Sequence, residues 1–227
     1  MCGRYSLFTP RGDLEARFDA AFEGFEPRYN AAPGQSLPVV TDADPDRARW
    51  LEWGLVPRWA DSASDSHINA RAETVADKPA FAEAYERRRC LVPADGFYEW
   101  VDDGGGTQPY RVAYDDDRPF AMAGLWERWT PETRQAGLGD FGDGASEPTD
   151  GGPIETFTVI TTEPNEVVEP LHHRMAVILG PEEEDEWLAG GDVPLDPAPP
   201  SGLRSYPVST AVNSPANDDP ELIRPLE

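Results

Sequence analysis

The sequence predicts an α+β fold in which strands predominate. Short runs of β-branched and aromatic residues recur along the 227 residues, and turn-forming clusters at 102–106 and 115–117 separate them. Only three segments have the apolar spacing of a helix, and they do not alternate regularly with the strand-like runs. This order argues against a parallel α/β sheet, in which strands and helices alternate.

Three helices are expected, beginning near Pro10, spanning about 79–88, and running from 181 to about 190. In the first, Thr9 can cap the helix and Pro10 suits its first position. Leu14, Phe18 and Phe22 then recur at intervals of four residues, as on one face of a helix. In the third, the glutamates at 182–184 favour the positive end of the helix dipole.

Six runs have the composition of strands: 47–53, 97–101, 110–114, 120–126, 156–161 and 175–179. Residues 131–152 are rich in glycine and acid, which predicts a surface insertion. A proline-rich segment from about 192 is expected to be extended. No repeat or domain boundary is evident, so we expect one domain over residues 1–227.

The net charge is −24, from 43 acidic and 19 basic residues, and Lys78 is the only lysine. An acidic surface can keep a protein away from DNA, or it can keep a protein hydrated in a cytoplasm at molar salt. We favour the second interpretation because the acid is spread along the whole chain. No apolar run is long enough to span a bilayer, and the N-terminus does not resemble a signal peptide. We therefore expect a cytoplasmic protein without membrane contact. We also expect a monomer.

The two cysteines, Cys2 and Cys90, form no disulfide framework and no metal-ligand spacing, and we expect neither a metal nor a cofactor. Cys90 precedes an apolar run and is expected to be a buried filler. Cys2 on its own could be an inert small residue. Removal of Met1, however, would give it a free α-amine beside its thiol. Such an aminothiol forms a Schiff base with an aldehyde and then closes a thiazolidine ring.

Eight motifs surround these residues in a fixed order: 2–5 (CGRY), 28–34 (RYNAAPG), 53–59 (WGLVPRW), 69–74 (NARAET), 90–100 (CLVPADGFYEW), 120–127 (FAMAGLWE), 158–162 (TVITT) and 171–175 (LHHRM). Over residues 2–205 this order closely resembles the SRAP family, the SOS-response-associated peptidase-like proteins that shield abasic sites in single-stranded DNA. The resemblance implies a mainly antiparallel, barrel-like β core with a few flanking helices. It also implies that the partner is single-stranded DNA containing abasic sites.

The resemblance further implies a role for individual residues. Cys2 would form the crosslink, Asn69 would lie beside the abasic sugar, Glu99 would act as acid and base, and His172 would be the active-site histidine. The residues implied to contact DNA are Arg4, Arg58 and Arg71 at phosphates, Thr161 in the pocket, and Trp53 and Trp59 near the binding face. Ala176 stands where the family usually has proline, a difference that we expect to alter a strand entry.

The chemistry of these residue types agrees with the implied roles. Ring opening, loss of water and thiol deprotonation all move protons, which a carboxylic acid and a histidine can carry. Glu99 lies between Tyr98 and Trp100, a setting that could favour its protonated form. We interpret His173 as the exposed neighbour of His172.

Arginines in or beside the motifs predict a local basic groove on an acidic body: Arg4, Arg28, Arg58, Arg71 and Arg174. We interpret the further run at 87–89 as a solvated helix end.

Two other functions remain open at this point. Cys2, His172 and Glu99 could instead form a thiol peptidase or amidase with an N-terminal nucleophile. The chain could also be a DNA-binding module without catalysis, whose activity would not depend on the Cys2 thiol.

The charge leads to a first prediction. At low ionic strength the Debye length grows to about 30 Å at 0.01 M, so the carboxylates repel one another and oppose folding. Thermal melts in potassium chloride from about 0.1 M to about 3 M should show stability rising with salt. A melting temperature that is as high at the low end would contradict the adaptation to salt.

Overall fold

A closed barrel of five strands forms the centre of the computed structural model, which describes residues 2–102, 104, 106–131 and 152–226. The strands follow the order β10 (Ile154–Thr162), β4 (Asp44–Trp53), β3 (Ser36–Thr41), β6 (Arg89–Ala94) and β9 (Phe120–Trp129). The barrel closes because β9 pairs with both β6 and β10, and only the pairing of β10 with β4 is parallel. The predicted α+β, barrel-like and mainly antiparallel fold is therefore confirmed.

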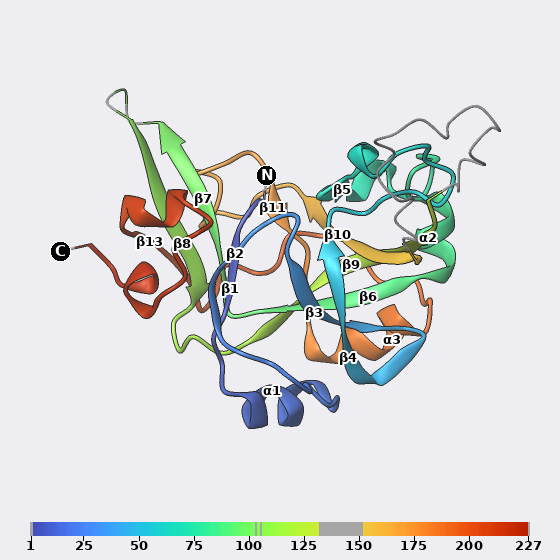
Figure 1. Ribbon diagram of the computed structural model, residues 1–227. Coiled ribbons are helices and arrows are strands. Elements are labelled where there is room, and N and C mark those ends of the chain that lie inside the picture. The colour runs from blue at the N-terminus through green and yellow to red at the C-terminus, as the bar shows by residue number, and fades with distance from the viewer. Residues whose placement is uncertain (1, 103, 105, 132–151, 227) are drawn as a thin grey trace, which may run out of the picture.

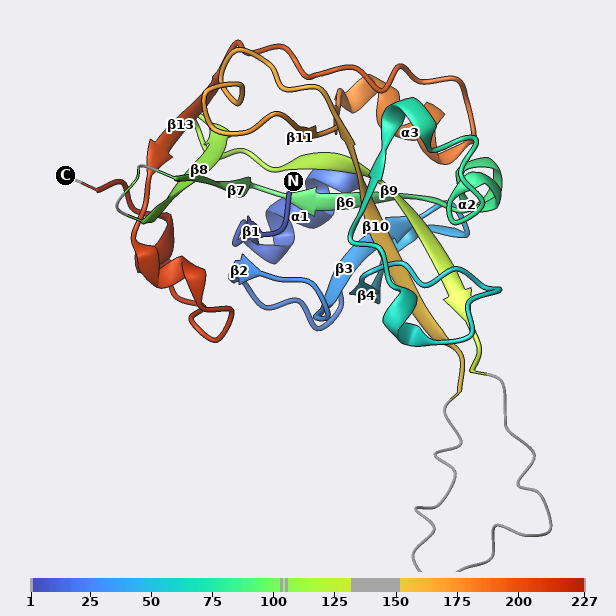
Figure 2. The ribbon, with the colours of Figure 1, turned by 90° about the horizontal axis from the view of Figure 1, so that it is seen from above.

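A second, fully antiparallel sheet lies beside the barrel (Figure 1). Its order is β13 (Leu203–Pro207), β8 (Thr107–Tyr114), β7 (Gly96–Asp102), β1 (Tyr5–Leu7) and β2 (Arg28–Ala31). Glycine at position 96 allows β7 to begin against Arg111, because a Cβ there would lie 2.6 Å from the guanidinium. In the view from above, the N-terminal residues lead into this sheet through β1 (Figure 2).

Three short strands extend the barrel: β5 (Asn69–Arg71), β11 (Met175–Ala176) and β12 (Ile178–Leu179). The predicted strand 175–179 is thus divided in two. Val177 separates the halves because its N–H donates to Ile160 of β10 while its carbonyl accepts from Ala123 of β9. The chain here crosses from one barrel strand to the next, and β11 pairs with β10 while β12 pairs with β9.

The helices are α1 (Arg11–Phe18), α2 (Ala82–Arg87) and α3 (Pro181–Leu188), with single 3₁₀ turns η1 (Ala63–Asp65), η2 (Ala72–Thr74), η3 (Thr210–Asn213) and η4 (Pro220–Ile223). All three predicted helices exist, but the first two are shorter than expected. Asp19 adopts a left-handed conformation that ends α1, so Phe22 is buried outside the helix. The predicted cap was wrong: Thr9 gives its N–H and hydroxyl to Asp95, and Pro10 occupies the cap position without a side-chain hydrogen bond.

Two further sequence interpretations concern residues 87–90. Cys90 is fully buried in the barrel, as predicted. Arg88 and Arg89, in contrast, are not a solvated helix end. Arg88 donates to Glu127 at 2.9 Å, and Arg89 donates to the carbonyls of Tyr85 and Gly191.

Composition also led to expectations about a proline-rich segment, an acidic insertion and membrane-spanning helices. Residues 192–199 contain no helix or strand and lead from α3 to β13, as the proline content predicts. The expected insertion at 131–152 falls almost entirely outside the described residues. Within the described part of the chain, no helix has both the length and the apolar character needed to cross a bilayer.

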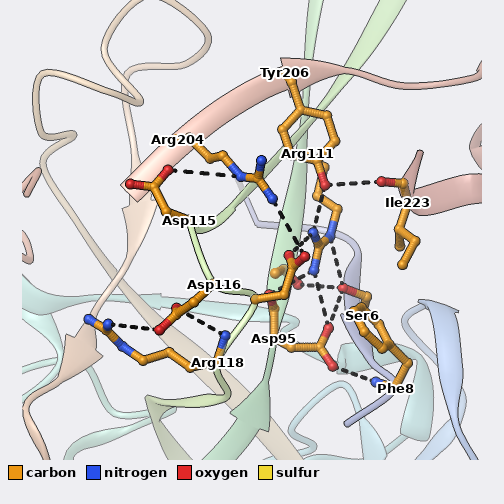
Figure 3. Close-up of polar contacts among 12 residues, drawn as sticks. Ser6, Phe8, Asp95, Arg111, Asp115, Asp116, Arg118, Arg204, Tyr206 and Ile223 are labelled. Carbon is orange, nitrogen blue, oxygen red and sulfur yellow. Dashed lines mark hydrogen bonds and ion pairs between the residues drawn. The ribbon is translucent and has the colours of Figure 1, made fainter. Parts of the chain in front are cut away.

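A buried ion pair joins β8 of the second sheet to the turn that follows barrel strand β6 (Figure 3). Arg111 of β8 is fully buried and donates to the Asp95 carbonyl at 2.8 Å and to Asp117 at 2.6 Å. Asp95, in the turn between β6 and β7, accepts from the Ser6 hydroxyl at 2.7 Å and from two backbone N–H groups after β1. These contacts fix β1 against β7 and β8.

The buried network supports a second prediction. Arg111→Met should lower the free energy of unfolding by about 3–5 kcal/mol, because it leaves the Asp95 carboxylate buried without its partner. Urea unfolding at high salt would measure the loss. Arg118→Met is the matched control, since its side chain and that of its partner Asp116 are 57% and 60% exposed. Equal stabilities of the two variants would contradict the role given to Arg111.

Candidate active site

Cys2 is buried at the end of the second sheet, next to the strand that carries Glu99. The antiparallel pairing of β1 with β7 sets Tyr5 opposite Phe97, and the Tyr98 N–H donates to the Arg4 carbonyl at 3.0 Å. The residues that precede Tyr5 therefore run alongside the next residues of β7. The sheet thus delivers the N-terminal segment to Glu99.

Asn69 closes this site from the barrel side. It begins β5, which pairs in parallel with β10 so that Asn69 lies opposite Val159. Its Nδ2 donates to the Cys2 carbonyl at 2.9 Å. Its Oδ1 is buried and accepts no hydrogen bond from the described residues. An amide with one end anchored on Cys2 and the other end open can accept a hydrogen bond from a group bound at Cys2.

Burial raises the pKa of the Glu99 carboxyl. The side chain is 2% exposed, and this burial raises its pKa to about 7. A carboxylic acid normally loses its proton near pH 4. With a pKa near neutrality, Glu99 can both give and take a proton at physiological pH, which is what a general acid–base residue needs.

The pKa of the Cys2 thiol is also raised. Burial raises its pKa above the ordinary value of a thiol, and the nearby charge of Glu99 raises it further. The thiol is therefore neutral at rest and must give up its proton during any reaction. Cysteine nucleophiles of hydrolases have lowered pKa values instead.

His172 lies on the loop between β10 and β11, next to β5. Its Nδ1 lies 3.0 Å from the Arg174 backbone nitrogen and 3.2 Å from the Arg174 carbonyl oxygen, so it accepts from the first or donates to the second according to the tautomer of the ring. Burial is the largest cause that lowers its pKa, and this keeps the ring neutral. His173 is exposed, as predicted, and its ring lies 4.2 Å from that of His172.

An ion pair holds the segments of Asn69 and His172 together. Arg174 forms two hydrogen bonds with Glu73, which follows β5, and donates to the Thr161 carbonyl of β10. The side chain of Arg174 is 10% exposed. Arg174 is thus a structural residue and not a free cation of a groove. Glu73 lies within the motif at 69–74, but its role depends on its contact with Arg174, 101 residues away, which no local sequence pattern reveals.

The other predicted DNA-contacting residues take different positions. Arg71 is exposed at the end of β5, and Arg58 and Trp59 are exposed beside α2. Arg58 pairs with Glu83 at 2.7 Å, and Trp59 donates to the Pro79 carbonyl at 3.3 Å. These three therefore lie outside the buried set formed around Cys2.

Two predicted residues are buried. Trp53 is 1% exposed, its ring is stacked on that of Phe157, and its Nε1 donates to the Ile68 carbonyl at 2.9 Å. Thr161 is also 1% exposed, and its hydroxyl donates to the Ala70 carbonyl at 3.2 Å. Trp53 supports the barrel wall behind β5, and Thr161 fixes β5 on β10. In this conformation neither side chain presents a surface to solvent.

No group of three or more histidine, cysteine or acidic side chains could hold a metal ion within the described ranges. An acid with a pKa near 7 and an open amide acceptor lie beside one buried thiol, and a histidine whose pKa is lowered lies on the loop next to β5.

Several known proteins are similar to this chain over most of its length. The chain is 39% identical to the abasic site processing protein YoqW of Bacillus subtilis, over 98% of this chain and 99% of that protein. It is 34% identical to the abasic site processing protein HMCES of Gallus gallus, over 89% of this chain and 67% of that one. A crystal structure of a protein from Bacteroides thetaiotaomicron superposes over the full length of both chains with a TM-score of 0.83 at 26% identity.

The SOS response associated peptidase (SRAP) family matches residues 1–215. That span includes both sheets and every residue placed around Cys2 above. The chain belongs to the SRAP family.

Proposed function

We propose that this protein captures abasic sites in single-stranded DNA by forming a thiazolidine with Cys2, after removal of Met1 has freed the α-amine. The single observation that carries the proposal is the placement of the buried Cys2 between Glu99, whose pKa is raised to about 7, and the Asn69 amide. Relatives of similar length are described as abasic site processing proteins.

The proposed reaction begins with the ring-closed hemiacetal of the abasic sugar. As the ring opens to the aldehyde, His172 gives a proton to the ring oxygen and takes the proton of the C1′ hydroxyl. The α-amine then attacks the C1′ aldehyde, and one amine proton moves to the oxygen to give a carbinolamine. Protonated Glu99 gives its proton to the departing hydroxyl, so that one water leaves and a protonated imine remains. The open Oδ1 of Asn69 accepts a hydrogen bond from the sugar during these steps.

Ring closure follows at the same carbon. The Cys2 sulfur adds to C1′, the C=N bond becomes a single bond, and the thiol proton passes to the Glu99 carboxylate. Glu99 thus gives one proton and takes another, and the balance is the loss of a single water. A raised thiol pKa fits this sequence, because the proton is removed only when the imine is in place.

The thiol peptidase or amidase alternative needs a thiolate at rest. Burial and the charge of Glu99 both raise the pKa of the Cys2 thiol and so oppose it. Removal of Met1 could still be a single self-processing event in this site, which we include in the proposal.

The third prediction tests the crosslinking residue. Cys2→Ala should abolish the adduct that survives heating on a denaturing gel, and it should leave non-covalent binding of single-stranded DNA largely intact. Cys2→Ser should give at most a Schiff base that borohydride can trap, because a hydroxyl closes the ring poorly. Intact mass should show wild-type protein without Met1.

The control for this prediction is Cys90→Ala, which removes the only other thiol from a fully buried position in the barrel. It should crosslink at the wild-type rate. A heat-stable adduct in Cys2→Ala, or Met1 retained in crosslinking protein, would refute the mechanism.

The fourth prediction concerns Glu99. Glu99→Gln should slow crosslinking by about 10²–10⁴-fold, the usual contribution of a general acid–base residue, with little change in DNA affinity. Wild-type protein should show a bell-shaped pH profile. The α-amine, which ordinarily titrates near pH 8, gives the rising limb, and loss of the Glu99 proton near pH 7 gives the falling limb. The variant should keep only the rising limb.

A stability measurement separates this role from a structural one. A raised pKa means that folded protein binds the Glu99 proton more tightly than unfolded protein does, so stability falls as pH rises from about 4.5 to about 7. Glu99→Gln should therefore be more stable than wild type at pH 8 and nearly equal at pH 4. A slow variant that is also less stable at pH 8 would contradict the assignment.

A further inference from the structure

A tyrosine hydroxyl without a partner lies in the core that contains the reacting cysteine. Tyr5 is fully buried, and its hydroxyl forms no hydrogen bond with any of the described residues. Cys2 is equally buried and belongs to the same core. We propose that Tyr5 is a further catalytic residue, whose hydroxyl donates a hydrogen bond to the Cys2 sulfur while the thiazolidine ring closes. This inference rests on the proposed function and adds a residue to it.

The ring of Tyr5 is part of the wall of the site. β1 holds the residue between β2 and β7, and its ring centroid lies 5.2 Å from that of Trp53. The Nε1 of Trp53 donates to the Ile68 carbonyl. The next residue, Asn69, donates to the Cys2 carbonyl. Tyr5 and Cys2 are therefore connected through this wall as well as along the chain.

The hydroxyl of Tyr5 and the thiol of Cys2 are electrostatic neighbours. Burial is the largest cause that raises the pKa of the Tyr5 hydroxyl, and the negative charge of Cys2 is the next, ahead of that of Cys90. Such an interaction weakens with distance, so the two groups lie near each other. A hydroxyl with a raised pKa keeps its proton at neutral pH. Tyr5 can therefore donate a hydrogen bond throughout the reaction without being consumed.

The resting thiol does not require this hydrogen bond. Burial raises the pKa of the Cys2 thiol and keeps it neutral, and a neutral thiol is only a weak acceptor. Negative charge develops on the sulfur when its proton passes to Glu99 during ring closure. The Tyr5 hydroxyl then gains a strong acceptor, and no proton needs to leave Tyr5.

A second donor is already directed at the sulfur. A hydrogen bond from the backbone N–H of Arg4 favours the thiolate form of Cys2. The Tyr5 hydroxyl would add a side-chain donor from the next residue. Donors that act on a charge present only during the reaction stabilise the transition state more than the resting protein. The pair would do for sulfur what two N–H groups do for an oxyanion.

The unpaired hydroxyl does not contribute to the stability of the fold. A buried polar group without a partner destabilises a folded protein, and phenylalanine has the same ring without the hydroxyl. Tyr98 of β7 is as deeply buried, but its hydroxyl donates to the Tyr29 carbonyl at 2.7 Å. The contrast between the two buried tyrosines points to a use for the Tyr5 hydroxyl in the reaction.

The fifth prediction compares Tyr5→Phe with wild type on single-stranded DNA that contains a reactive abasic site. Samples taken over time are divided between borohydride, which traps the imine, and heating, which only the thiazolidine survives. At saturating DNA, Tyr5→Phe should form the heat-stable adduct about 10-fold or more slowly and should accumulate trappable imine, because a donor to the developing charge is lost. The DNA concentration that gives half the maximal rate should not change.

Thermal melts separate this role from a structural one. Tyr5→Phe should melt at or above the wild-type temperature at high salt, because it removes a buried hydroxyl that has no partner. Tyr98→Phe is the matched control. It removes a buried hydroxyl that has a partner, so it should melt at a lower temperature and still close the ring at the wild-type rate.

Two further samples test whether the hydroxyl acts on the sulfur. In Cys2→Ser only the imine forms at a useful rate, so adding Tyr5→Phe to it should leave imine formation unchanged. Wild-type protein with 3-fluorotyrosine in place of Tyr5 retains a hydroxyl donor and should close the ring at least as fast as wild type. A loss of ring closure in that sample would contradict the proposal even if Tyr5→Phe did not fold.

Equal rates of ring closure in wild type and Tyr5→Phe, or slower imine formation when Tyr5→Phe is added to Cys2→Ser, would overturn the assignment. Failure of the proposed function has a different result. Wild-type protein would then give no heat-stable adduct that depends on Cys2. Failure of this inference alone would leave that adduct forming equally in wild type and Tyr5→Phe.

Discussion

The pairing of β1 with β7 is the constraint on which the rest of the site depends. A reaction through the α-amine and thiol of one residue can occur only at the N-terminus of a chain, which is ordinarily its most mobile part. Here the second strand of this pairing also carries Glu99, so the same backbone hydrogen bonds hold the N-terminal segment and bring the acid to it. The Arg111–Asp95 network then holds β1 from its other end, through Ser6 and the residues that follow.

Burial of Glu99 has two opposite consequences. Ionisation of a buried carboxyl is unfavourable, and a pKa near 7 means that the folded protein at neutral pH keeps a group that would be more stable as an amide. The same shift gives the group a proton to donate at the pH where the α-amine begins to be neutral. Trp53, stacked on Phe157, supports the barrel wall behind β5.

Much of the fold could be predicted from the sequence, because its strands alternate and its turns are marked by acidic and glycine clusters. Short strands such as β1 and β5 have only three residues each, which is too few to show an alternation of apolar and polar side chains. The motifs include these residues, but their sequence did not predict that they form strands. The motifs also led to Cys2, Asn69, Glu99 and His172. They did not reveal that Trp53 is buried or that Arg174 is paired with Glu73, because both facts depend on contacts between distant segments.

The acidic surface and the anionic ligand of the proposed function can be reconciled through the geometry of the arginines. Most arginines of the described chain are neutralised by carboxylates, as Arg58 is by Glu83, so the net basic groove expected from the sequence is largely absent in this conformation. Molar salt would weaken these exposed pairs and also the attraction of DNA phosphates, because released counterions then add little to affinity. Stacking on an aromatic ring does not depend on counterion release, and a covalent bond to Cys2 does not depend on equilibrium affinity at all. The proposed capture therefore needs a bound strand only for as long as the amine takes to reach the aldehyde, and it does not need the broad basic groove whose attraction high salt would weaken.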